Sequence, residues 1–161
     1  MRTKSMLQLC TLLVIAILVN STSAMSAAAE RTLPLKGVVS GQEIDVFQPP
    51  ATISVHGNGA GNATLLGRFS VEYTVDVDLG AHSGPAAAKF VAANGDIIVV
   101  QGSGEAHDTD VPGVVRIVET FSVIGGTGRF ANASGELRVE RLVDVSTGGT
   151  SGTFSGNVVL P

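Results

Sequence analysis

Two charged side chains occupy positions where the surrounding pattern calls for apolar ones. Residues 113–124 alternate between apolar and polar side chains, and Glu119 falls on the apolar face with Val115, Ile117, Phe121 and Val123. Residues 136–146 alternate in the same way, and Arg141 falls on the apolar face with Leu137, Val139, Val143 and Val145. A buried ionised group costs several kcal/mol unless it is paired and hydrogen-bonded. A carboxylate and a guanidinium at such positions can hold each other or anchor a polar group of a ligand.

A hairpin between these two segments would bring the charges together. Glu119 lies six residues before Gly125, and Arg141 lies six residues after Gly135. A symmetric hairpin therefore places Glu119 opposite Arg141, and it also pairs Phe121 with Val139, Val123 with Leu137 and Ile117 with Val143. Three interpretations stay open: a structural ion pair, an anchor in a ligand pocket, or a wrong assignment of the faces.

Aromatic side chains complete the candidate pocket. Phe69 and Tyr73 share one face of residues 64–79 with Val71, Val75 and Val77. Tyr73 would add a phenolic donor to the same interior, although core packing with a satisfied hydroxyl is the alternative. We also expect Gly156 to leave space beside Arg141. The candidate ligand-binding residues are Glu119, Arg141, Tyr73, Phe69 and Phe121.

Two further motifs carry less chemistry. Residues 124–131 contain the outline G-x-G-x-x-A of a dinucleotide-binding turn. Alternation resumes at Leu137, which leaves no room for the helix that such a turn requires, so a tight structural loop is favoured. His107, Asp108 and Asp110 are metal-ligand types, but such loops are common. We therefore expect no metal and no cofactor, and the absence of a nucleophile elbow leaves catalytic residues unassigned.

The N-terminal segment has the pattern of a secretory signal peptide. Arg2 and Lys4 precede an apolar run over residues 7–19, and small residues follow. The run is shorter than the roughly 20 residues of a membrane span, so we predict a signal peptide over residues 1–29, cleaved after Ala24 or Ala29. An uncleaved signal anchor is the alternative. The predicted location is extracellular or periplasmic, with no membrane partner after cleavage.

Composition limits the partners of the remaining chain. The full sequence has 10 Lys and Arg against 14 Asp and Glu, and two of the cations, Arg2 and Lys4, lie in the predicted signal peptide. The rest is therefore more acidic than the whole and has no basic patch. Nucleic acid is accordingly excluded as an expected partner. The only cysteine, Cys10, also lies in that segment, so a cleaved chain cannot form an internal disulfide.

Period-2 alternation dominates after residue 29, and no helical period is sustained there. The sequence predicts one domain over residues 30–161, an all-β, closed, eight-stranded antiparallel barrel, with a two-sheet sandwich as the alternative. Asn94-Gly95 predicts a hairpin with a type I′ turn, and residues 57–62 are interpreted as a flexible connector. The predicted strands are 35–47, 51–57, 64–79, 86–93, 96–103, 113–124, 136–146 and 151–160.

The motif Gly125-Gly-Thr-Gly-Arg-Phe130, followed by Ala133 and Gly135, is similar to plant dirigent proteins and allene oxide cyclases. With residues 66–69, 93–96 and 152–156, the chain resembles exported bacterial proteins with an allene-oxide-cyclase-like barrel more closely. The resemblance implies an eight-stranded barrel. The plant proteins assemble as trimers, which leaves room for a homo-oligomer. Their catalytic residues cannot be placed on this sequence.

The expected function is binding of a small hydrophobic ligand, or service as a structural module. The alternative is an isomerase or cyclase that acts on a hydrophobic substrate in the lumen, or a dirigent-type coupling protein. Interior volume separates these functions. A lumen filled by its own side chains leaves only the structural module, whereas an apolar cavity of roughly 300 Å³ or more supports binding or catalysis.

Overall fold

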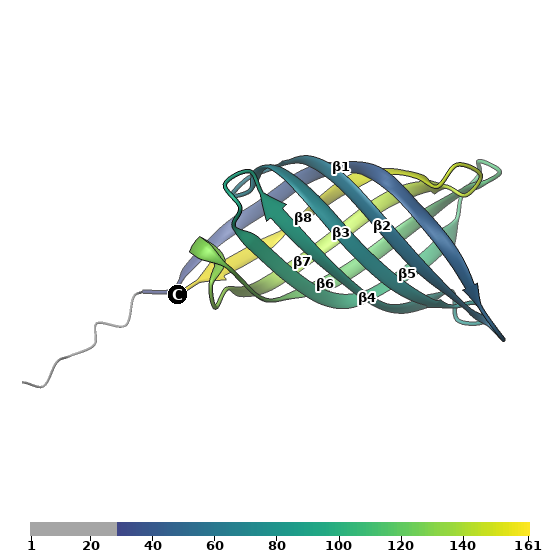
Figure 1. Cartoon of the computed structure of the whole chain (residues 1–161), viewed down its shortest axis with the longest axis horizontal. Helices are drawn as coiled ribbons and strands as arrows, with labels where there is room; N and C mark the ends of the chain where they lie inside the picture. The colour runs from purple at the N-terminus through teal and green to yellow at the C-terminus, as the bar shows by residue number, and fades with distance from the viewer. Residues whose placement is uncertain (1–28) are drawn as a thin grey trace, which may run out of the picture.

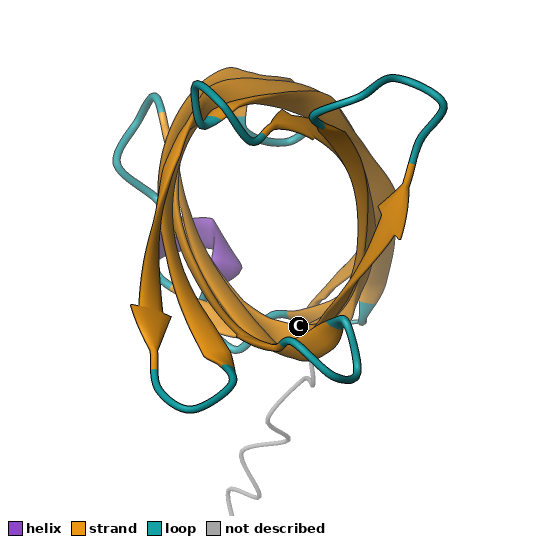
Figure 2. Ribbon diagram, turned by 90° about the vertical axis from the view of Figure 1, so that its right-hand side faces the viewer, coloured by secondary structure: helices purple, strands orange, loops and turns teal. Residues whose placement is uncertain are grey.

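The computed structural model describes residues 29–161, which fold as one closed barrel of eight antiparallel strands (Figures 1 and 2). The strands follow chain order around the barrel, and β1 pairs with β8 to close it. The predicted architecture is confirmed, and the sandwich is wrong. The strands are β1 (Arg31–Gln48), β2 (Thr52–Ala63), β3 (Gly67–Asp78), β4 (Ser83–Ala92), β5 (Ile97–Asp108), β6 (Val114–Gly126), β7 (Ser134–Asp144) and β8 (Gly149–Leu160).

The predicted signal peptide lies almost entirely outside the described residues and stays a prediction. Within residues 29–161, no helix is long and apolar enough to cross a membrane.

Alternation along each strand divides lumen from solvent. In β3, Phe69, Val71 and Val75 are buried and Tyr73 is half-buried, whereas Ser70, Glu72 and Thr74, which alternate with them, are exposed. Closure gives every strand two hydrogen-bonded neighbours, so no sheet edge is left unpaired. The barrel therefore buries its apolar faces against one another in the interior, without helices to cover them.

The predicted connector at residues 57–62 is wrong, because these residues form the second half of β2. Gly57 pairs with Tyr73, and Gly61 pairs with Phe69. A Cβ atom at Gly57 would lie 1.9 Å from Tyr73 Cζ, and one at Gly61 would lie 1.9 Å from the carbonyl oxygen of Val38 and 3.0 Å from Phe69 Cζ. An aromatic ring packs over Gly57, and both a backbone carbonyl and an aromatic ring crowd Gly61, so the missing side chains are a packing requirement.

The hairpin predicted at Asn94-Gly95 joins β4 to β5, but its turn is not type I′. The turn spans four residues, 93–96, and Gly95 has φ +87° while Asn94 does not have a positive φ. The amide of Gly95 donates to the carbonyl of Ala92 at 2.9 Å. Only one left-handed residue is needed, and the glycine supplies it.

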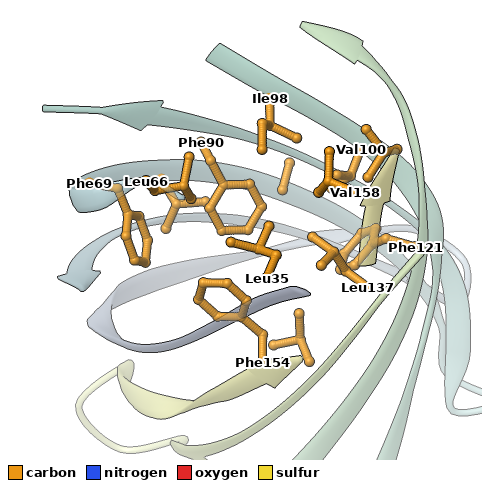
Figure 3. Close-up of a cluster of buried hydrophobic side chains, with 14 of the residues drawn as sticks. Leu35, Leu66, Phe69, Phe90, Ile98, Val100, Phe121, Leu137, Phe154 and Val158 are labelled. Atoms are coloured by element: carbon orange, nitrogen blue, oxygen red, sulfur yellow. The ribbon is translucent and has the colours of Figure 1, made fainter. Parts of the chain in front are cut away.

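The hydrophobic core fills the end of the barrel at which the chain's C-terminus lies. Phe69, Phe90 and Phe154 pack with ring centroids 5.5–5.6 Å apart, and Figure 3 shows them around Leu35. Each ring pair is tilted or edge-on, the arrangement that aromatic quadrupoles favour. This half of the lumen is packed with side chains.

The glycine-rich loop after β6 closes the same end. The loop contains a short 3₁₀ helix, η1 (Gly128–Phe130), which is the purple segment in Figure 2. The side chain of Phe130 is fully buried. Arg129 forms an ion pair with Asp96 of the β4–β5 turn at 3.4 Å, and its guanidinium donates to the carbonyl of Leu65 in the β2–β3 turn. The loop thus ties three turns together. A single 3₁₀ turn cannot act as a dinucleotide-binding helix, so the structural interpretation of the motif is confirmed.

The buried side chain of Phe130 is called the plug, because it closes this end of the barrel. Phe130→Ala should lower the free energy of unfolding by about 3–5 kcal/mol, because it leaves a cavity where the ring was. Urea denaturation measures the change. Phe47→Ala is the matched control, since Phe47 is 57% exposed at the other end of β1. A loss at Phe130 no larger than the loss at Phe47 would show that the plug contributes nothing to stability.

Gly57→Ala should destabilise the barrel by about 1–3 kcal/mol, because the new methyl group overlaps the Tyr73 ring. The penalty should shrink in a Tyr73→Ala background, where the ring is gone, and a double-mutant cycle measures that coupling. Gly80→Ala is the control and should stay within about 0.5 kcal/mol, because Gly80 lies in a turn without a positive φ. Equal penalties with and without Tyr73 would contradict the packing explanation.

Candidate functional site

The β6–β7 hairpin differs in register from the prediction by two residues. Glu119 pairs with Val139, and Arg141 pairs with Ile117. The predicted pairing is wrong because Gly125 and Gly126 do not turn toward β7 but continue along β5, opposite Val99 and Ile98. An even shift leaves every side chain on its predicted face. Both charges therefore point into the lumen, diagonally related instead of directly opposite.

Glu119 and Arg141 form the predicted ion pair. Arg141 Nε donates to Glu119 Oε2 at 3.2 Å, and Nη2 donates to Oε1 at 3.2 Å. Each side chain is only 5% exposed. Two parallel hydrogen bonds between a guanidinium and a carboxylate are geometrically specific and hold both groups in one orientation.

Sequence analysis missed a third charge, Glu43 of β1. Its Oε2 lies 2.5 Å from Arg141 Nη1 and also accepts a hydrogen bond from the Tyr73 hydroxyl at 2.8 Å. Arg141 Nη1 also donates to Thr150 Oγ1 at 3.2 Å. The signal was present in the sequence, because Glu43 has the same parity as Leu35 and Val39, which face inward.

This group of Glu43, Tyr73, Glu119, Arg141 and Thr150, the charged layer, crosses the lumen between five strands. Burial disfavours the charged form of Arg141, but the attraction of Glu119 and Glu43 outweighs it and raises the pKa of Arg141 above its ordinary value. Burial is also the main reason why the pKa of Tyr73 is raised, with Arg141 opposing the shift and Glu43 adding to it. Arg141 therefore stays charged, and Tyr73 stays a hydrogen-bond donor.

Small residues make room for the charged layer. A Cβ atom at Gly104 would lie 3.1 Å from Glu119 Cγ, and Gly57 accommodates the Tyr73 ring. The glycine beside Arg141 is Gly152, its partner in β8. The expectation for Gly156 is wrong, because the pairing of β7 with β8 places it opposite Leu137.

An open cavity of about 200 Å³ lies on the side of the charged layer away from the core. Glu43 and Arg141 border it, and a groove of about 300 Å³ at the rim shares Glu43 and Asp45 with it. The cavity is smaller than the roughly 300 Å³ expected of a ligand pocket, yet this half of the lumen is not filled. Its apolar wall consists of Ile53, Val55, Val75, Val77, Leu79, Ala106, Val115, Ile117, Val143 and Val145.

The five candidate residues do not share one space. Arg141 borders the open cavity and also a void of about 40 Å³ on the core side. Of these two spaces, Glu119, Tyr73 and Phe121 border the void and not the open cavity, and Phe69 belongs to the packed core. The charged layer therefore separates a filled half of the barrel from an open half.

His107 and Asp108 are the last two residues of β5 and Asp110 lies in the turn after it, and none of the three borders the cavity. His107 Nε2 lies 3.7 Å from Glu105 at the barrel surface. Within residues 29–161, no three His, Cys, Asp or Glu side chains lie close enough to hold a metal ion.

The fold is that of a dirigent-like barrel. The structure of the pterocarpan synthase dirigent protein GePTS1 superposes with a TM-score of 0.57 over 88% of this chain and 98% of that chain, at 17% sequence identity. No protein-family model matches the chain, and no curated protein matches its sequence. At this identity the likeness concerns the fold alone.

Arg141→Met should lower the free energy of unfolding at pH 7 by about 3–5 kcal/mol, because it leaves two buried carboxylates without a cation. Glu119→Gln should cost less, since the amide keeps a hydrogen-bond acceptor and Glu43 still pairs with Arg141. Urea denaturation of both variants measures the difference.

The Arg141→Met loss should also depend on pH. Without the cation, the folded state buries two uncompensated negative charges, and protonation would neutralise them. The variant should therefore regain stability as pH falls from 7 toward 5. The triple variant Glu43→Gln, Glu119→Gln, Arg141→Met should lose this dependence. A near-neutral Arg141→Met would mean that solvent reaches the charged layer.

Proposed function

We propose that this protein binds a small apolar ligand in the open half of the barrel. One observation carries the proposal: an apolar cavity ends on a buried, hydrogen-bonded charged layer while the other half of the lumen is packed. Binding pockets combine apolar walls with a few convergent polar groups in this way. A purely structural barrel would gain more from filling the space, because empty volume forfeits packing contacts.

The cavity volume limits the ligand. An engineered cavity of about 150 Å³ in another protein binds benzene. A cavity of about 200 Å³ therefore suits a single ring with a short substituent, and a longer substituent would extend into the rim groove.

The narrower resemblance to exported bacterial allene-oxide-cyclase-like proteins is part of this proposal. Export follows from the N-terminal pattern, and it places binding outside the cytoplasm, with neither nucleic acid nor membrane as partner. Assembly into a homo-oligomer is compatible with the resemblance.

A second function, isomerisation, cyclisation or coupling of a hydrophobic substrate, is favoured by the carboxylates beside the cavity. Burial and then repulsion by Glu43 raise the pKa of Asp45, and Arg141 partly opposes the shift. A raised carboxyl pKa moves the group toward the range useful for proton transfer at neutral pH. Conversion of a bound probe, rather than its return unchanged, would establish this function.

Titration with 2-phenylethanol, followed by amide chemical shifts, tests the binding proposal. We expect shifts at the cavity walls that saturate, and loss of binding in Ala106→Phe, which fills the cavity from β5. Ala60→Phe is the control, because Ala60 is exposed on the outer face of β2. Absence of any shift at the walls would favour the structural module.

A further inference from the structure

The charges around the cavity are unbalanced. Glu43 and Asp45 border it, whereas Arg141 is the only permanently charged cation among its lining residues. Glu119 also pairs with Arg141, on the side of the charged layer that faces the packed core. Carboxylates therefore outnumber the cation on the polar surface that a ligand would meet.

Arg141 is already occupied by the protein. Its Nε and Nη2 contact both oxygens of Glu119, and its Nη1 contacts Glu43 and Thr150. These contacts use four of the five N–H groups of the guanidinium. A ligand anion that displaced one of the carboxylates would leave it buried without a partner, which is costly, so the guanidinium is a poor anion site although it borders the cavity.

One carboxylate oxygen of Glu43 is available to accept a hydrogen bond from a ligand. Its Oε2 receives both Arg141 and Tyr73, whereas its Oε1 has no hydrogen-bond partner among residues 29–161. The Glu43 side chain is only 7% exposed and borders the cavity. A carboxylate oxygen in this position accepts strong hydrogen bonds from a charged donor.

Asp45 lies two residues further along the same face of β1, toward the rim. The repulsion between Asp45 and Glu43 contributes to the raised pKa of Asp45. A cation placed between these two side chains would relieve that repulsion.

We propose that the open half of the lumen selects small organic ammonium ions, with the apolar part against the Val and Ile walls and the N–H donors on Glu43 Oε1 and Asp45. This inference rests on the proposed binding function and specifies its ligand class. An inorganic cation would lack the apolar body that the walls bury, so the walls favour an organic one.

Three probes with the same ring test the charge preference: 2-phenylethylammonium, 2-phenylethanol and 3-phenylpropanoate. Dissociation constants at pH 7 come from amide shifts of the purified protein. A charged hydrogen bond should make the ammonium ion bind about 10- to 100-fold more tightly than the alcohol. The carboxylate should bind most weakly.

Glu43→Gln should remove about tenfold or more of the affinity advantage that the ammonium ion has over the alcohol. Glu72→Gln is the matched control, because Glu72 is 72% exposed on the outer face of β3, where it pairs with Lys89. It should retain the full preference. Asp45→Asn, at the exposed rim, provides a second test if Glu43→Gln does not fold.

The outcomes separate the two proposals. Equal affinities for the three probes, or tightest binding of the carboxylate, would overturn the charge preference and leave the binding function intact. An unchanged ammonium preference in both Glu43→Gln and Asp45→Asn would also overturn it. Failure of all three probes to shift the cavity walls would overturn the binding function itself.

Discussion

The interior depends on one buried guanidinium held between two carboxylates. Arg141 of β7 contacts Glu119 of β6 and Glu43 of β1, so three strands that meet around the lumen are joined at one level. Such a group adds little net stability compared with apolar packing. Its effect is to fix where the apolar packing ends. Each desolvated charge needs its partner, so apolar side chains cannot fill the lumen at this level. The packed half ends at this level, and the open half begins there.

Stability of the described chain has to come from closure and from the packed half. Pairing of β1 with β8 completes the hydrogen-bonded ring, and no cysteine lies within residues 29–161. The phenylalanines of the core fit a barrel this narrow because glycines face them: a Cβ atom at Gly37 would lie 2.5 Å from Phe154 Cζ. The plug of Phe130 and the ties of Arg129 then close the end of the barrel. The open half can remain open because the other half provides the core.

The alternation of apolar and polar residues correctly predicted which face of each strand points inward, but it did not predict the register between strands. Alternation alone placed Glu119 and Arg141 on the inner faces, and an even shift of register preserved that result. The register of β6 against β7 depends on where β6 stops pairing with β7. The glycines of the β6–β7 loop do not indicate that β6 continues along β5 beyond that point. Residues 57–62 were misassigned because their short side chains show no alternation, although aromatic rings on β3 require them. Glu43 was predictable by the same parity argument, whereas the cavity volume was not.

The contacts of the charged layer also limit the chemistry that the cavity can support. Arg141 and Tyr73 both have pKa values raised away from neutrality, so they act as a fixed charge and a fixed donor and do not exchange protons during turnover. Glu43 Oε2 is held by both of them. Among the carboxylates at the cavity, the oxygens left for proton transfer with a bound molecule are Glu43 Oε1 and those of Asp45, whose pKa is raised by burial and by its neighbour. The two groups that would recognise a ligand donor are thus the same two that could act as bases, so affinity and catalysis would compete for the same oxygens.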